Sequence, residues 1–230
     1  GKIDSIINAE IRQKNIAGGV ALIIHKNNVV LDKAYGYADV AAARSMKTTD
    51  IFRIASQTKA IVSIAFLQLI ENNKISLDTP IEKFIPSFAK QKVAVIESAG
   101  FKLVDLERSI TLRDLLTHQS GISSADEYPK FKPLFEKYNL NKSLNSGFNN
   151  LEDEVAQIAA MPLIHQPGAR FSYGLSTNVL GRLIEIMSKM PLGQYLNKYV
   201  FVPLKMNDTY FYLPSDKKKR LVKAYTKVNK

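Results

Sequence analysis

The stretch IFRIASQTKAIVSIAFLQLIENN, residues 51–73, predicts a long helix that begins close to Ser56. Apolar residues recur along it at helical spacing, namely Ile61, Ile64, Ala65 and Leu69. Further apolar residues flank this row, so we expect a central helix that is buried nearly all round. Ser56 and Lys59 stand three positions apart at its start, which places their side chains on the same face.

The Ser56–Lys59 pair has two interpretations. Serine is a common residue at helix starts, and a lysine one turn later is commonly exposed to solvent. Alternatively, Ser56 is a nucleophile and Lys59 takes its proton, which requires burial or nearby cations to lower the pKa of the lysine. The helix N-terminus would then favour developing negative charge, and its amides could contribute to an oxyanion site. Taken alone, an S-x-x-K tetrad leaves both interpretations open.

The composition narrows the function classes. The chain has 230 residues, of which 46% are hydrophobic and 23% charged, as is typical of a globular protein. No run of about 18 apolar residues occurs, so we expect no membrane span. The net charge of +11 comes from scattered lysines and the tail 215–230. Because no Lys/Arg stripe is interleaved with aromatic residues, we expect a solvated basic surface and no nucleic-acid partner.

The chain has no cysteine, which excludes disulfides, thiolate metal sites and thiol nucleophiles. Its three histidines, His25, His118 and His165, lie far apart and not at metal-ligand spacings, so we expect neither a metal nor another cofactor. The N-terminus lacks the apolar core of a signal peptide. These observations leave the compartment open between periplasm or secretion and cytoplasm.

Secondary structure is predicted most clearly near the N-terminus. Residues 1–16 have the apolar spacing of an amphipathic helix. Two β-rich runs, Val20–His25 and Val29–Tyr37, then flank Asn27 and Asn28, which predicts a tight hairpin. A two-stranded hairpin is marginally stable alone and needs more sheet.

From residue 51 onward we expect mostly helix. Thr111 and Asp114 resemble a capping box, and Gly121 can close the helix that follows. Further helices are expected over 151–161 and 177–190, and NDTYFYL, residues 207–213, reads as a short extended piece.

Several blocks resemble one known family, in the order in which that family carries them: AYGYADV, IFRIASQTKA, LIENNKISLDTPIEKFIPSF, ITLRDLLTHQSGI, PGARFSYGLSTNVLGRLIE and FVPLKMNDTYFYL. The chain from about Asn15 to Leu213 is similar to the serine β-lactamases and penicillin-binding proteins, in which S-x-x-K opens a buried helix. The likeness is greatest to the class C-like branch, with its family VIII esterases and D-aminopeptidase-like hydrolases. It implies an α/β (α+β) fold with an antiparallel sheet flanked by helices and a mostly helical lobe.

The resemblance also implies a site. Ser56 would be the nucleophile, Lys59 its partner and Tyr173 the general base that returns the proton to the leaving group. Leu175 would line the substrate pocket. His165 stands beside the tyrosine loop PGARFSYG, residues 167–174, and from this position we expect it to line the pocket as well. Leu175 stands where β-lactamases carry an Asn that binds a substrate amide, which favours esters over D-amino-acid peptides or amides and over β-lactams.

The chain also departs from the family in length. We find no Lys-Thr-Gly-like third motif after Leu213, and the family's remaining strands are missing. We therefore expect ranges of 1–50 (helix and hairpin), 51–213 (mostly helical) and 214–230 (basic tail), with the C-terminal strands lost or supplied by a second chain. The alternative to a hydrolase is a catalytically incomplete binding or assembly module of the same fold.

Overall fold

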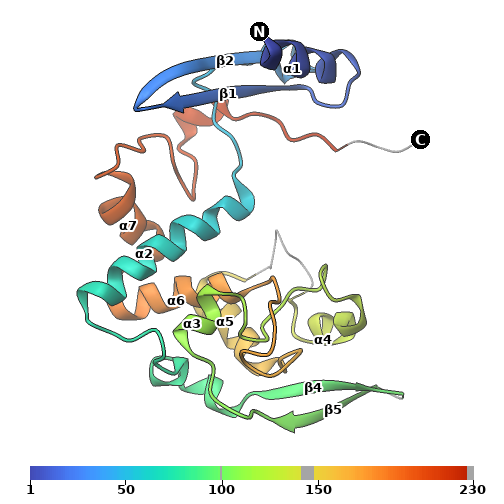
Figure 1. The fold of residues 1–230 in the computed structure, drawn as a ribbon, viewed down its shortest axis with the longest axis vertical. Coiled ribbons are helices and arrows are strands. Elements are labelled where there is room, and N and C mark those ends of the chain that lie inside the picture. Colours follow the sequence, from blue (N-terminus) through green and yellow to red (C-terminus); the bar gives the residue numbers. More distant parts are fainter. Residues whose placement is uncertain (99, 141–147, 227–230) are drawn as a thin grey trace. The chain divides into compact units, whose positions relative to one another are not determined.

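The computed structural model describes residues 1–98, 100–140 and 148–226. The chain divides into two compact units (Figure 1). Unit 1 comprises Gly1–Ala55 with Asp208–Lys230, and unit 2 comprises Ser56–Asn207. The expected basic tail groups with unit 1. Among the described residues, none of the helices is both long enough and apolar enough to cross a membrane.

Unit 1 is built on the predicted hairpin. Helix α1 (Lys2–Arg12) precedes strands β1 (Gly18–His25) and β2 (Asn28–Asp39), which pair antiparallel, and the short β3 (Arg44–Ser45) pairs with β2. His25 pairs with Asn28, so the turn residues are Lys26 and Asn27, one position earlier than expected. Both have positive φ, 47° and 66°, as a two-residue hairpin loop requires.

The segment after residue 207 is joined to the rest of unit 1 by polar contacts. Its 3₁₀ turn η6 (Ser215–Arg220) leads to Leu221, which forms a parallel bridge with Ile51. Arg220 binds Asp208 and donates to the Thr49 carbonyl. The expectation of an extended piece over residues 207–213 is wrong, because these residues form turns and bends and no strand is assigned to them.

Unit 2 holds the remaining α-helices of the described residues. Helices α2 (Thr58–Asn72) and α6 (Ser176–Ser188) pack together (Figure 1). The others are α3 (Leu112–Leu116), α4 (Lys132–Lys137), α5 (Leu151–Ala160) and α7 (Leu192–Leu196), the last continued by the π-helical turn η5 (Asn197–Phe201). Helix α2 buries Val62, Ala65, Phe66, Leu69 and Ile70.

Helix α2 is not buried all round. Ile64 is 62% exposed and Leu67 is 43% exposed, which corrects the expectation that the apolar residues on every side are covered. The buried residues follow the spacing of three and four that defines one stripe of a helix. The apolar composition of the segment identified the helix correctly but did not identify its buried face.

A second hairpin lies in unit 2, in a stretch that we expected to be mostly helical. Strands β4 (Lys92–Glu97) and β5 (Gly100–Asp105) pair antiparallel. Val93 also forms a parallel bridge with Leu163, and the Ala94 amide donates to the Leu163 carbonyl at 2.8 Å. The segment that precedes the tyrosine loop is therefore held to the edge of this hairpin.

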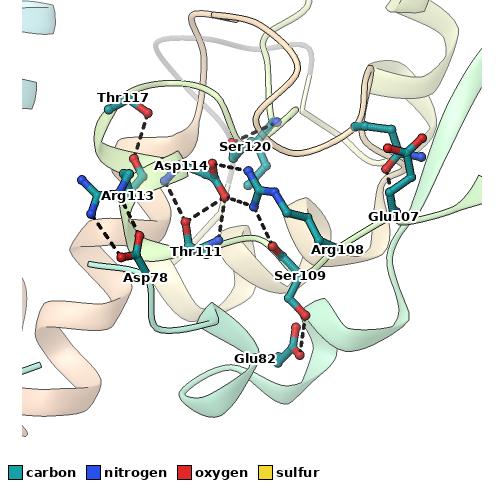
Figure 2. A network of polar contacts seen from close by, with 12 residues as sticks. Asp78, Glu82, Glu107, Arg108, Ser109, Thr111, Arg113, Asp114, Thr117 and Ser120 are labelled. Carbon is teal, nitrogen blue, oxygen red and sulfur yellow. Dashed lines mark hydrogen bonds and ion pairs between the residues drawn. The ribbon is translucent and has the colours of Figure 1, made fainter. Parts of the chain in front are cut away.

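Helix α3 begins at the predicted capping box, within a network of polar contacts (Figure 2). The Thr111 side chain accepts from the Asp114 amide, and the Asp114 carboxylate accepts from the Thr111 amide at 2.9 Å. The Arg108 guanidinium forms a bidentate ion pair with the same carboxylate, and its two nitrogens donate to the two Asp114 oxygens at 2.6 and 2.8 Å. Burial opposes ionisation of Asp114, but Arg108 and Thr111 outweigh it, and the pKa of this carboxyl is lowered. The network fixes the start of a short helix whose far end reaches the candidate site.

Candidate active site

Ser56 and Lys59 lie side by side where α2 begins. Ser56 is in the 3₁₀ turn η1 (Ala55–Gln57) that runs directly into the helix. The Lys59 Nζ is 3.4 Å from the Ser56 Oγ and is the donor in this contact. Ser56 is exposed, whereas Lys59 is half-buried. A substrate can therefore reach the hydroxyl, and the Lys59 amino group lies next to it.

The residue immediately before Ser56 has a strained backbone. Ala55 has φ of 43°, in the left-handed region that residues with a Cβ rarely adopt. Such a conformation costs on the order of 1 kcal/mol or more and is found preferentially at functional sites. The strained residue is adjacent to Ser56, and this observation is independent of the contact between Ser56 and Lys59.

Tyr173 joins the pair from a distant part of the chain. The Lys59 Nζ lies 4.7 Å from the centre of the Tyr173 ring. The pKa of Tyr173 is lowered from 10.0, first by the nearby Lys59 side chain and then by that of Ser56. A tyrosine that loses its proton more readily is better suited to act as a base near neutral pH. The three residues expected to be catalytic are therefore brought together within unit 2.

The backbone around Tyr173 is held by Ser123. The Ser123 hydroxyl donates to the Tyr173 carbonyl at 3.0 Å. Gly174 lies so close to Ser123 that a Cβ built on it would be 2.3 Å from the Ser123 carbonyl carbon, and its three nearest neighbours are all backbone atoms. No side chain fits there unless the backbone moves. Tyr173 is thus anchored on one side by a hydrogen bond and on the other by close packing.

His165, which we expected to line the substrate pocket, is 9% exposed and engaged by both ring nitrogens. Its Nδ1 is 2.8 Å from the Gln166 carbonyl and its Nε2 is 2.7 Å from the Ser172 hydroxyl. Because a carbonyl only accepts, Nδ1 carries the proton of a neutral ring, Nε2 accepts from Ser172, and Tyr128 donates to Ser172 at 3.0 Å. Burial lowers the pKa of His165, which favours this neutral form.

The side chain of His165 also lines a hollow of about 490 Å³, which includes Val93, Phe131 and Arg170. Ser56, Lys59 and Tyr173 are not among the described residues of this hollow. The structure therefore connects His165 to the site through Ser172, the residue before Tyr173. Leu175, the other expected pocket residue, precedes α6 as its N-cap and packs, half-buried, against the core.

His118, which the sequence did not single out for the site, lies against Tyr173. Its ring centre is 5.1 Å from that of Tyr173, with 32° between the ring planes. The LLTHQSG block contained one signal for this, a histidine at a helix end where glycine is usual. Among the described residues, no cluster of His, Cys, Asp or Glu could hold a metal ion.

Comparison with known proteins identifies the family of the chain. The family model described as Beta-lactamase matches residues 3–230. Esterase EstB of Burkholderia gladioli is 28% identical over 214 residues, which are 91% of this chain and 51% of that protein. The chain spans about half the length of the curated relatives it matches.

Solved structures show the same relationship. EstCE1, a hydrolase with promiscuous acyltransferase activity, superposes with a TM-score of 0.84 at 26% sequence identity. The superposition covers 99% of this chain and 56% of the EstCE1 chain. The octameric penicillin-binding protein homologue from Pyrococcus abyssi superposes with a TM-score of 0.73 at 28% sequence identity. This superposition covers 96% of the present chain and 47% of the homologue's chain. The α+β fold of helices and antiparallel sheets expected from the sequence is confirmed. The chain belongs to the beta-lactamase family.

Proposed function

We propose that the protein containing this chain is a serine hydrolase that works through an acyl-enzyme. The observation that supports this most directly is the contact of Lys59 with both the Ser56 hydroxyl and the Tyr173 ring. A serine hydroxyl becomes an effective nucleophile when a neighbouring group takes its proton. Here one such group is Tyr173, a tyrosine whose pKa is lowered, and Lys59 lies between it and the serine hydroxyl.

In the proposed reaction, the Ser56 Oγ attacks the carbonyl carbon of an ester as its proton passes to the Tyr173 phenolate, beside the Lys59 ammonium. The C–O bond to the leaving alcohol then breaks, and the proton returns from Tyr173 to the departing oxygen. A water molecule attacks the resulting acyl-enzyme by the same proton route, which releases the acid and restores Ser56. Amides at the start of α2 favour the oxyanion formed in each half-reaction.

We place small esters first among the substrates, D-amino-acid peptides or amides second, and β-lactams third. Leu175 offers no hydrogen bond to a substrate amide, whereas an ester needs none at that position. The family relationship supports esters as the first candidate, since one relative is named as an esterase.

The test uses the full-length protein and a fluorophosphonate probe, followed by mass spectrometry. We expect a single adduct on Ser56, and we expect Ser56→Ala to reduce hydrolysis of p-nitrophenyl acetate by about 10³-fold or more. Ser63→Ala, which removes the next serine along α2, is the matched control and should leave the rate unchanged. Wild-type rates in Ser56→Ala, with no adduct on Ser56, would contradict the proposal and favour the binding-module alternative.

A further inference from the structure

His118 occupies a special position at the end of α3. The Gln119 amide donates to the Asp114 carbonyl at 2.8 Å, and the His118 amide donates to the Leu115 carbonyl at 3.3 Å. These two bonds form a Schellman ending, in which the residue at the His118 position is left-handed and is usually glycine. His118 adopts that conformation, with φ of 54°.

This position makes the histidine side chain costly to the fold. A residue with a Cβ is strained at this φ, whereas glycine would end the helix without strain. In addition, the His118 Nδ1 is buried and has no hydrogen-bond partner among the described residues. A buried polar atom without a partner is destabilising. The requirements of the helix end therefore do not explain why the residue is histidine.

His118 contacts the tyrosine loop through both its ring and its backbone carbonyl. Its ring packs against Tyr173 at 5.1 Å and against Phe171, in an edge-on arrangement, at 5.7 Å. Its carbonyl accepts from the Ser172 amide at 2.7 Å. One residue thus touches three consecutive residues of the loop, two through its side chain and one through its backbone.

We propose that His118 is a positioning residue, whose ring holds the Tyr173 ring in place against Lys59. This inference rests on the proposed function, because it matters to catalysis only if Tyr173 transfers protons. Without the imidazole, the phenol ring has room to turn away from Lys59 and Ser56. Small losses of alignment between reacting groups reduce rates strongly while leaving substrate binding nearly unchanged.

The charge state of the ring is consistent with this role. Burial, and then the positive charge of Lys59, lower the pKa of His118, so its ring is neutral at physiological pH. The charged side chains that act on Tyr173 itself are Lys59, which lowers its pKa, and Glu127, which raises it. A neutral imidazole packs against the phenol without adding a second positive charge beside Lys59.

The experiment compares three substitutions in the full-length protein, namely His118→Gly, His118→Asn and His118→Phe. Glycine and asparagine tolerate the left-handed conformation but remove the ring, whereas phenylalanine keeps a ring and the strain. We expect Ser56 labelling by the fluorophosphonate, and kcat for p-nitrophenyl acetate, to fall about 10- to 100-fold for Gly and Asn, with KM within about two-fold. The Phe variant should stay within about five-fold of wild type.

Stability should follow the opposite order. We expect the Tm of the Gly and Asn variants to lie within about 2 °C of wild type, because relief of strain offsets lost packing, and the Phe variant to melt lower. Lys189→Gly is the matched control, since Lys189 ends α6 with φ of 57° and is exposed. It should raise the Tm slightly and leave the rate unchanged.

A spectroscopic measurement separates this inference from the proposed function. With ¹³Cζ-labelled tyrosine, the Tyr173 resonance should shift or broaden in His118→Gly and stay unchanged in Lys189→Gly, whether or not the protein hydrolyses esters. An unchanged Tyr173 resonance and wild-type labelling of Ser56 in His118→Gly would overturn the inference. A third outcome is that the Tyr173 resonance shifts in His118→Gly while the Ser56→Ala variant remains active. This outcome would support the packing of His118 against Tyr173 and would overturn only its importance for catalysis.

Discussion

The two units of the molecule bury apolar surface to very different extents. Every member of the large buried cluster lies in unit 2, between Val62 and Phe201. In unit 1, the buried hydrophobic residues among those described are Tyr35, Ala38 and Met46, and α1 buries none. Unit 2 therefore has a hydrophobic core of its own, whereas the described part of unit 1 has almost none.

Unit 1 is held instead by charged and polar contacts. Asp4 of α1 binds Lys33 and Tyr35 of β2, Lys223 binds Asp39, and Arg220 binds Asp208. Its hairpin meanwhile leaves large apolar side chains exposed, namely Leu22, Ile24, Val29 and Val30. Because partly exposed ion pairs contribute less to stability than a hydrophobic core does, we expect unit 1 to open before unit 2 and to respond more strongly to salt and acid.

The largest contrast should come from truncating one apolar side chain in each unit. Phe66 in α2 is fully buried, and Phe66→Ala should cost about 3–5 kcal/mol because it leaves a cavity. Val30 is 59% exposed, and Val30→Ala should change stability by less than about 0.5 kcal/mol. Urea unfolding followed by circular dichroism measures both. Similar costs for the two variants would contradict the contrast between the units.

A smaller effect is expected from Asp114, the buried carboxylate in unit 2. Asp114→Asn should cost about 2 kcal/mol, because the Arg108 and Thr111 bonds to a charged group are lost. Since the pKa of Asp114 is lowered below 3.8 in the folded state, its contribution is full above pH 3.8 and is lost as the pH falls through the lower folded value.

The difference in stability between wild type and Asp114→Asn should therefore become smaller at acidic pH. Thermal melts of both proteins at a series of pH values test this. Asn150→Ala, which removes the cap of α5 in the same unit without removing a charge, is the control and should lose the same stability at every pH. If the stability difference between wild type and Asp114→Asn did not change with pH, the Arg108–Asp114 ion pair would contribute nothing to stability.

A weaker and salt-dependent effect is expected at Asp208 in unit 1. Arg220 and then Lys217 lower the pKa of Asp208 to about 2, so its contribution is lost as the pH falls from 3.8 toward that value. Asp208→Asn should speed hydrogen exchange at Ile51, whose amide donates to the Arg220 carbonyl. The effect should shrink in about 1 M NaCl, where charges are screened within about 3 Å. Faster exchange in unit 2 would contradict the separation of the two units.

The smallest change in folding stability should come from the exposed hairpin face. Leu22 and Ile24 are 57% and 58% exposed, so replacing both with threonine should change the free energy of unfolding by less than about 0.5 kcal/mol. Contiguous exposed apolar surface promotes association, so the double variant should scatter less light than wild type at the same concentration. A large loss of stability would show that this face is already covered within the chain.

Local signals in the sequence predicted local structure well. The β1–β2 hairpin and the Thr111 capping box depend on short-range patterns, and both are confirmed. The adjacency of Ser56 and Lys59 likewise follows from their spacing along the chain. The exposure of Ile64 was not predicted, because it depends on which elements pack against α2.

The remaining features needed the tertiary structure. Tyr173 could be placed beside Lys59 only through the family resemblance, since nothing in its local sequence points to α2. The contact of His118 with the same tyrosine depends on a left-handed residue at a helix end, where the sequence suggested Gly121 as the closing residue. The hydrogen bonds that engage His165 and Ser172 likewise join separate segments, so no spacing rule predicts them.

The packing of Gly174 against Ser123 has a consequence for anyone who randomises the tyrosine loop. Because the three nearest neighbours of its missing Cβ are backbone atoms, no rotamer change elsewhere makes room for a side chain. In a combinatorial library that varies position 174, we expect nearly all variants to have an unfolded or misaligned loop. Position 175 is half-buried, and because we propose that Leu175 faces the substrate, substrate preference is better diversified there.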